Sequence, residues 1–196
     1  MDKLFVIFNP AARGEKSQRI RRFLETKTGS SITLAPTQRA GEARHLAARA
    51  VTEGYRVVVA AGGDGTINEV INGLGASGAA LGVLPLGTVN VFARELGIPR
   101  RVEAAWAVIE NGRTRTIDLA RAESNGVARY FMQLAGVGVD ARAVRAASWE
   151  LKKRIGPLSY VWAGLKMTKS LSIVEKRVYC RGEPEASQTR TRGGSQ

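Results

Sequence analysis

Short apolar runs and segments of helical periodicity alternate along the first half of the chain. Short, largely apolar runs at residues 4–8, 31–35, 57–61 and 79–84 predict strands, and the valine run at 57–59 is typical of a buried strand. Between them, apolar residues recur at every third or fourth position, which is the spacing of one helix face. Strands that alternate with helices through short connections form parallel units with right-handed crossovers. The pattern therefore predicts an α/β fold built on a parallel sheet.

Each expected helix carries one apolar stripe. Behind the third strand the stripe consists of Ile67, Val70, Ile71 and Leu74, at positions i, i+3, i+4 and i+7. Four other helices are expected. The first contains Ile20 and Leu24, the second spans 42–53, the third carries Phe92 and Leu96, and the fourth spans 101–112.

The pattern changes near residue 120, where we place a domain boundary. Two strand-like stretches, 114–121 and 129–135, flank the polar turn 123–126 and predict a hairpin. Basic helical stretches follow, one ending near Arg154 and one spanning 158–171. We therefore expect an α/β domain over 1–120, a partial second β-rich lobe with helices over 121–180, and a polar, disordered tail over 181–196.

A glycine-rich turn connects the third strand to its helix. Gly62, Gly63 and Gly65 allow the backbone to approach a ligand without an intervening Cβ. The turn presents backbone N–H groups and the positive end of a helix dipole, so it suits a phosphate. Asp64 would repel that phosphate unless a divalent cation lies between them, and Mg²⁺ is commonly held by one or two carboxylates and phosphate oxygens. The alternative is that Asp64 only caps the helix that begins at Thr66.

Polar or glycine residues follow all four predicted strands. Asn9 follows the first strand, Thr37 the second, the glycine turn the third, and Gly87 with Thr88 the fourth. Ligands of open α/β sheets bind beyond the carboxyl ends of the strands. The four loops therefore predict one site at one edge of the sheet.

Composition and charge narrow the class of partner. Hydrophobic residues make up 44% of the chain and charged residues 24%, which is typical of a globular protein. The formal charge of +13 implies attraction to polyanions such as nucleic acid, anionic phospholipid surfaces or nucleotide phosphates. Because no zinc-finger or RNP-like pattern is visible, we expect no nucleic-acid partner. A single cysteine, and no segment typical of a signal peptide or a membrane span, favour a cytoplasmic protein.

Three common patterns do not fit. The G-x-G-x-x-G-like sequences that begin at Gly73 and Gly136 lack the element order or the βαβ context of a dinucleotide-binding fold. No G-x-x-x-x-G-K-[ST] sequence occurs, which excludes a P-loop kinase. A Ser-His-Asp catalytic triad is also excluded, because the only histidine, His45, has no plausible nucleophile near it and is expected at the surface.

The sequence GGDGT at 62–66, followed by Asn68 and Glu69, resembles the signature of the diacylglycerol kinase catalytic-domain family. That family includes sphingosine kinases and bacterial lipid kinases, and NAD kinases and 6-phosphofructokinases are more distant relatives. The motif that begins at Gly136 resembles the opening of the family's second domain. Further matches occur in the family's order: Asn9-Pro10 with Gly14, Thr37, Pro85-Leu86-Gly87-Thr88 with Asn90, and Phe92-Ala93-Arg94.

The resemblance implies a parallel-sheet nucleotide-binding domain like that of NAD kinases and diacylglycerol kinases, plus a partial β-rich second domain. It implies an ATP-dependent lipid kinase of phospholipid metabolism, which phosphorylates a hydroxyl of diacylglycerol or a related lipid. The implied cofactors are ATP and Mg²⁺, with Asp64 at the metal directly or through water. The implied nucleotide-binding residues are Asn9, Pro10, Thr37, Gly62, Gly63, Asp64, Gly65, Thr66, Asn68, Gly87, Thr88 and Asn90.

Two departures from the family's pattern bear on catalysis. Val91 stands where the family usually has an aspartate after the asparagine, so any contact made by that carboxylate is lost. The family's second domain also supplies a carboxylate, in a later Asp-Gly motif, to deprotonate the lipid hydroxyl. No such motif occurs in the chain, so we expect a truncated second domain without the catalytic base. The alternatives are an NAD kinase-like enzyme and an inactive nucleotide- or lipid-binding module.

Basic and aromatic residues are mixed after residue 140. Arg142, Arg145 and the run Lys152-Lys153-Arg154 share one predicted helical stretch with Trp149. Each basic residue near an anionic membrane contributes about 1 kcal/mol of attraction, and tryptophan suits the interface. We therefore expect peripheral docking at the inner membrane face, where the lipid substrate would be met. The alternative is that the aromatic residues are core and the charges are solvated; whether the chain forms a homodimer stays open.

Overall fold

The computed structural model describes residues 3–10, 14–27, 29 and 31–132. The chain divides into two units, Met1–Ala135 and Gly136–Gln196, and every described residue belongs to the first. The basic and aromatic cluster and the predicted helices that follow residue 140 lie outside the described residues, and so does the tail. The domain boundary expected near residue 120 stays a prediction. No helix in the described ranges combines the length and the apolar character needed to cross a bilayer.

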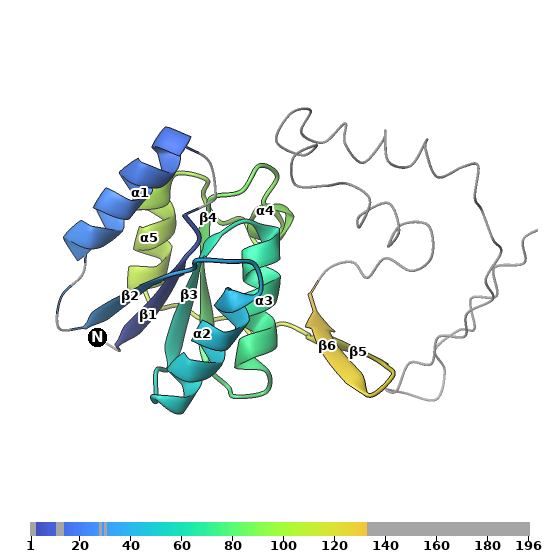
Figure 1. Ribbon diagram of the computed structural model, residues 1–196. Helices are drawn as coiled ribbons and strands as arrows, with labels where there is room; N and C mark the ends of the chain where they lie inside the picture. Colours follow the sequence, from blue (N-terminus) through green and yellow to red (C-terminus); the bar gives the residue numbers. More distant parts are fainter. Residues whose placement is uncertain (1–2, 11–13, 28, 30, 133–196) are drawn as a thin grey trace, which may run out of the picture. The chain divides into compact units, whose positions relative to one another are not determined.

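Four parallel strands form the central sheet, in the order β2-β1-β3-β4 (Figure 1). The two inner strands are the most buried, because strands flank them on both sides and helices cover both faces; all five residues of β1 are buried. The four predicted strands are confirmed, with β2 and β4 each displaced by one residue at both ends and β3 one residue longer at its carboxyl end. Their bounds are β1 (Leu4–Phe8), β2 (Ile32–Pro36), β3 (Val57–Gly62) and β4 (Ala80–Pro85).

Helices pack on both faces of this sheet (Figure 1). Successive strand residues point to opposite faces, so the described residues form two apolar cores. Phe5, Ile7 and Val58 belong to the core under α2, α3 and the short α4, whereas Val6 and Val59 belong to the core under α1 and α5. The helices are α1 (Gly14–Lys27), α2 (Glu42–Thr52), α3 (Asp64–Leu74), α4 (Val91–Glu95) and α5 (Val102–Glu110).

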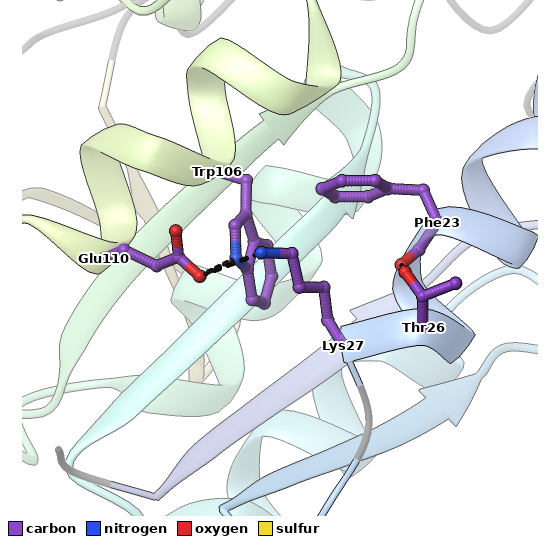
Figure 2. A network of polar contacts seen from close by, with 5 residues as sticks. All are labelled: Phe23, Thr26, Lys27, Trp106 and Glu110. Atoms are coloured by element: carbon purple, nitrogen blue, oxygen red, sulfur yellow. Dashed lines mark hydrogen bonds and ion pairs between the residues drawn. The ribbon is translucent and has the colours of Figure 1, made fainter.

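Figure 2 shows a polar network that joins α1 to α5. The indole N–H of Trp106 donates to Glu110 Oε1 at 2.6 Å, and Lys27 Nζ donates to the same oxygen at 3.1 Å. The rings of Phe23 and Trp106 meet edge to face with centroids 6.0 Å apart, and Lys27 Nζ lies within 6 Å of both. Because Trp106 is only 1% exposed, its N–H needs this acceptor. The network therefore joins α1 to α5, the two helices on the face of the sheet opposite α2 and α3.

A two-stranded hairpin follows the sheet domain's last helix. Its strands are β5 (Ala120–Ser124) and β6 (Val127–Phe131), joined by a turn in which Asn125 and Gly126 both have positive φ. The predicted hairpin is confirmed, but the prediction that its first strand starts at residue 114 is wrong. The two-residue turn sets a register that pairs Ala120 with Phe131 and leaves residues 114–118 exposed and unpaired within the described ranges.

One asparagine ties this hairpin to α3. Asn72 Nδ2 donates to the Tyr130 carbonyl at 2.9 Å, and Asn72 Oδ1 accepts the Tyr130 N–H at 2.9 Å. A carboxamide offers the same acceptor and donor as a peptide group, so Asn72 acts as a one-residue partner for the outer edge of β6. The Tyr130 ring also packs against the core beneath α3.

Candidate functional site

The carboxyl ends of the four strands lie level with one another. Phe8 pairs with Pro36 and Ala61, and Gly62 pairs with Pro85. The ladder continues one residue into the loops through three backbone bonds: Thr37 N–H to Phe8 O at 2.8 Å, Asn9 N–H to Ala61 O at 2.9 Å, and Leu86 N–H to Gly62 O at 2.8 Å. The structure thus brings the four predicted loops to one edge of the sheet.

Asn9 and Thr66 join the first loop to the glycine turn. Asn9 Nδ2 donates to Thr66 Oγ1 at 3.0 Å, and Thr66 is only 6% exposed. A Cβ on Gly62 would collide with the Thr66 side chain. Gly62 is therefore required by the packing of Thr66, and its lack of a side chain does not by itself point to a ligand.

The glycine turn also contacts the loop after β4. A Cβ on Gly87 would lie 2.7 Å from the Gly63 Cα, so both positions need glycine for this close approach. Asn90 stabilises this loop. It adopts a left-handed conformation, with φ of 51°, and is only 1% exposed. Its Oδ1 accepts the Gly87 N–H at 2.8 Å and its Nδ2 donates to the Gly87 carbonyl at 2.8 Å. Gly63, Gly87 and Asn90 thus build the loop pair itself.

Gly65 is the one glycine of the turn that faces open space. It is exposed, and a Cβ placed there would meet no other described residue within 4 Å. In a helix the Cβ leans toward the N-terminus, so this open space lies toward the mouth of the turn. The ligand role that the sequence suggested for all three glycines therefore fits Gly65 best.

Asp64 does not cap its own helix. The prediction of a helix start at Thr66 is wrong: α3 begins at Asp64, and its N-cap is Gly63. The Asp64 Oδ1 instead accepts the Phe92 N–H at 3.2 Å, in the first turn of α4. Asn90, the N-cap of α4, uses its own carboxamide on Gly87, so α4 takes its cap from Asp64.

The start of α2 is likewise occupied by a carboxylate from α3. Glu69 accepts the N–H groups of Gly41 at 2.9 Å and Ala43 at 3.2 Å. A second carboxylate, Glu42 Oε2, accepts the N–H groups of Gln38 and Arg39, which precede α2. The bond from Gln38, with a smaller contribution from Arg39, holds the pKa of the Glu42 carboxyl below its ordinary value.

The start of α3 differs from those of α2 and α4. Within the described residues, the N–H groups of Asp64, Gly65 and Thr66 have no side-chain acceptor. As far as the described residues go, N–H groups without a partner and the positive end of the dipole remain at this opening, as an anion requires. Of these three helix starts at the sheet edge, α3 is therefore the one suited to phosphate.

Asp64 could hold a divalent cation at this opening. Its Oδ1 is engaged with Phe92, and its Oδ2 makes no hydrogen bond within the described residues. The described ranges hold no group of three or more histidine, cysteine or acidic side chains that could bind a metal. A cation here would need phosphate oxygens and water as its other ligands, which is the usual coordination of Mg²⁺ on a nucleotide.

The remaining predicted residues belong to α3 and to the loops that follow β1, β2 and β4. Thr37 is 7% exposed and follows β2, whereas Pro10, Asn68 and Thr88 are exposed. His45 is exposed on α2, as expected. The structure adds the Phe92 N–H and the Glu69 carboxylate to the site. Neither could be assigned from sequence, because each bond joins residues at least 26 positions apart.

Comparison with known proteins gives consistent matches. The family model described as the diacylglycerol kinase catalytic domain matches residues 3–122. A diacylglycerol kinase of Bacillus subtilis is 37% identical over 192 residues, covering 93% of this chain and 61% of the relative. One of Staphylococcus saprophyticus is 35% identical over 179 residues, covering 88% and 57%. The chain thus spans less than two thirds of the length of these relatives.

Solved structures show the same similarity. The crystal structure of a diacylglycerol kinase from Bacillus anthracis superposes with a TM-score of 0.55 and 26% identity, covering 66% of this chain and 48% of that one. A candidate diacylglycerol kinase from the same organism gives a TM-score of 0.59 at 25% identity, covering 75% and 55%.

Proposed function

Because the chain belongs to the diacylglycerol kinase catalytic-domain family, we propose that it supplies the nucleotide site of an ATP-dependent lipid kinase. The acceptor in this proposal is a hydroxyl of diacylglycerol or a related lipid. The observation that carries the proposal is the start of α3, which no described side chain caps, while carboxylates occupy the starts of α2 and α4. Enzymes of phosphoryl transfer act mainly by positioning the reactants and stabilising charge, and this opening offers both.

In this proposal the phosphates lie over the first turn of α3. The N–H groups at Gly65 and Thr66 donate to phosphate oxygens, and the helix dipole adds the equivalent of about half a positive charge. Asp64 holds Mg²⁺, directly or through water, with the oxygen that Phe92 leaves available. Mg²⁺ would neutralise charge on the β- and γ-phosphates.

The other loops frame the nucleotide. Asn9 orients Thr66 from the loop after β1, and Thr37 borders the opening from the loop after β2. On the opposite side, Asn90 shapes the loop of Gly87. Asn68, Thr88 and Pro10 complete the rim in this proposal.

The acceptor would be met at a membrane surface. The formal charge of +13 supports attraction to anionic phospholipid, and we propose a cytoplasmic protein that docks peripherally. Vesicle co-sedimentation checks this: binding should favour anionic over neutral vesicles and weaken with salt. Equal binding to both vesicle types would contradict it.

A transfer assay tests the proposed activity. The 196-residue chain is incubated with γ-labelled ATP, Mg²⁺ and detergent micelles that contain diacylglycerol, with parallel reactions that contain NAD or no acceptor. Label in the lipid supports the proposal, whereas label in NAD identifies an NAD kinase-like enzyme. ATP binding without any labelled product identifies a nucleotide-binding module.

Asp64→Asn tests the proposed metal role of this carboxylate. The carboxamide oxygen can still accept the Phe92 N–H, so the cap on α4 is kept while the charge is lost. We expect weak nucleotide binding without metal to survive and its enhancement by Mg²⁺ to disappear.

A further inference from the structure

The Glu69 side chain caps a helix other than its own. From the second turn of α3, its two carboxylate oxygens accept the N–H groups of Gly41 and Ala43 at 2.9 and 3.2 Å. Gly41 is the N-cap of α2 and has no side chain with which to cap it. With a φ of 85°, Gly41 also adopts a left-handed conformation that a side-chain-bearing N-cap would rarely take. The cap that α2 needs therefore comes from α3.

Close packing between α2 and α3 fixes the reach of Glu69. A Cβ on Gly73 would collide with the Arg44 carbonyl oxygen and would lie 2.6 Å from the Ala47 Cβ. The two helices therefore approach each other at their backbones one turn beyond Glu69. With this spacing set, a bond from Glu69 to Gly41 places the start of α2 relative to α3 and its N-terminal opening.

The segment placed in this way carries Thr37. At its beginning, the Thr37 N–H is bonded to the Phe8 carbonyl, next to Asn9. At its end, Gly41 and Ala43 are bonded to Glu69. The segment 37–43 is thus held between the end of β1 and α3, the same helix that bears the phosphate opening.

We propose that Glu69 is a positioning residue, which holds Thr37 at the distance from the α3 opening that nucleotide binding requires. The inference rests on the proposed function, because Thr37 matters here only as a contact of the nucleotide. Both Glu69 carboxylate oxygens are engaged with the start of α2. Its effect on binding must therefore pass through the segment that contains Thr37.

A double-mutant cycle on Mg·ATP affinity tests the inference. Calorimetric titration of the full chain compares Glu69→Ala, Thr37→Val and the double variant. We expect Glu69→Ala to weaken binding about tenfold, a typical size for coupling between sites. In the Thr37→Val background the same change should have little further effect, because the contact that Glu69 positions is already lost. Glu69→Gln keeps an acceptor for one of the two N–H groups and should restore part of the affinity.

Glu53→Ala is the matched control. It removes an exposed carboxylate, paired with Arg49, from the opposite end of α2, and should leave Mg·ATP affinity unchanged. Unchanged affinity in Glu69→Ala, or an equal loss in both Thr37 backgrounds, would overturn the inference.

Amide hydrogen exchange without nucleotide separates this inference from the proposed function. In Glu69→Ala the amides of Gly41 and Ala43 should exchange faster, while those of the central strand β3 keep their rates. Normal exchange at Gly41 and Ala43 would overturn the positioning role whether or not ATP binds. Faster exchange in a protein that does not bind Mg·ATP would instead refute the proposed function.

Discussion

Adding one methyl group at Gly65 tests whether phosphate approaches the backbone at the start of α3. Gly65 is exposed in the first turn of the helix, and a Cβ there would meet no other described residue within 4 Å. Gly65→Ala therefore costs no packing. Alanine in place of a helical glycine should raise the free energy of unfolding by about 0.5–1 kcal/mol.

The same methyl group should oppose the nucleotide. It would lean toward the N-terminal opening and separate a bound phosphate from the N–H groups of the turn. A hydrogen bond to a charged group contributes about 1.5–3 kcal/mol, so loss of one weakens Mg·ATP binding about 10-fold to 150-fold. A more stable protein with weaker nucleotide binding is a combination that general damage to the fold does not produce.

Calorimetric titration and urea unfolding of the same preparations provide the two measurements. Gly29→Ala is the matched control, because its Cβ would also meet no described residue within 4 Å and it lies outside the four loops of the site. Gly63→Ala is a poorer probe, since its Cβ would lie 3.2 Å from the Gly87 Cα and disturb the loop pair. Unchanged or tighter Mg·ATP binding by Gly65→Ala would refute the placement of phosphate at this turn.

Three further predictions concern the fold around the site. Asn72→Leu removes both bonds to Tyr130 and should lower the free energy of unfolding by about 1–3 kcal/mol in urea titrations, whereas Leu at the exposed Asn111 should change it little. Trp106→Phe loses the bond to Glu110 and part of the volume of a fully buried side chain, so it should lower the free energy of unfolding by at least about 1 kcal/mol in the same assay; no loss would show that the Trp106–Glu110 bond in Figure 2 does not stabilise the fold. Because the folded pKa of Glu42 is lowered, its contribution is present above the ordinary glutamate pKa and lost as pH falls through the folded pKa, so Glu42→Gln should show a flatter loss of stability in acid.

The layered fold follows largely from local pattern. The valine run of β3 and the i, i+3, i+4, i+7 stripe of α3 depend only on neighbouring residues, and Ile67, Val70, Ile71 and Leu74 are all buried. Strand ends could be predicted within one residue because turn-forming residues follow each run. The start of the hairpin's first strand could not be predicted, because the length of that strand depends on the register set by the turn at Asn125 and Gly126.

The candidate site shows where such reasoning stops. Loop convergence follows from strand order, so the four loops could be placed without coordinates. The partners of Asp64 and Glu69 could not, because an acidic residue near a helix start suggests a cap for that helix and contains no information about a helix 26 or more positions away. Likewise, the sequence GGDGT does not reveal that Gly62 and Gly63 serve packing while Gly65 faces open space.

The most direct test of the central claim is the response of individual backbone amides to Mg·ATP. In a two-dimensional ¹H–¹⁵N titration of the chain, the largest shift changes should occur at Asp64, Gly65 and Thr66, in the uncapped first turn of α3. The amide of Gly41, already bonded to Glu69, should respond far less. Largest changes at Gly41, or no change at Gly65 at saturating Mg·ATP, would contradict the assignment of phosphate to the start of α3.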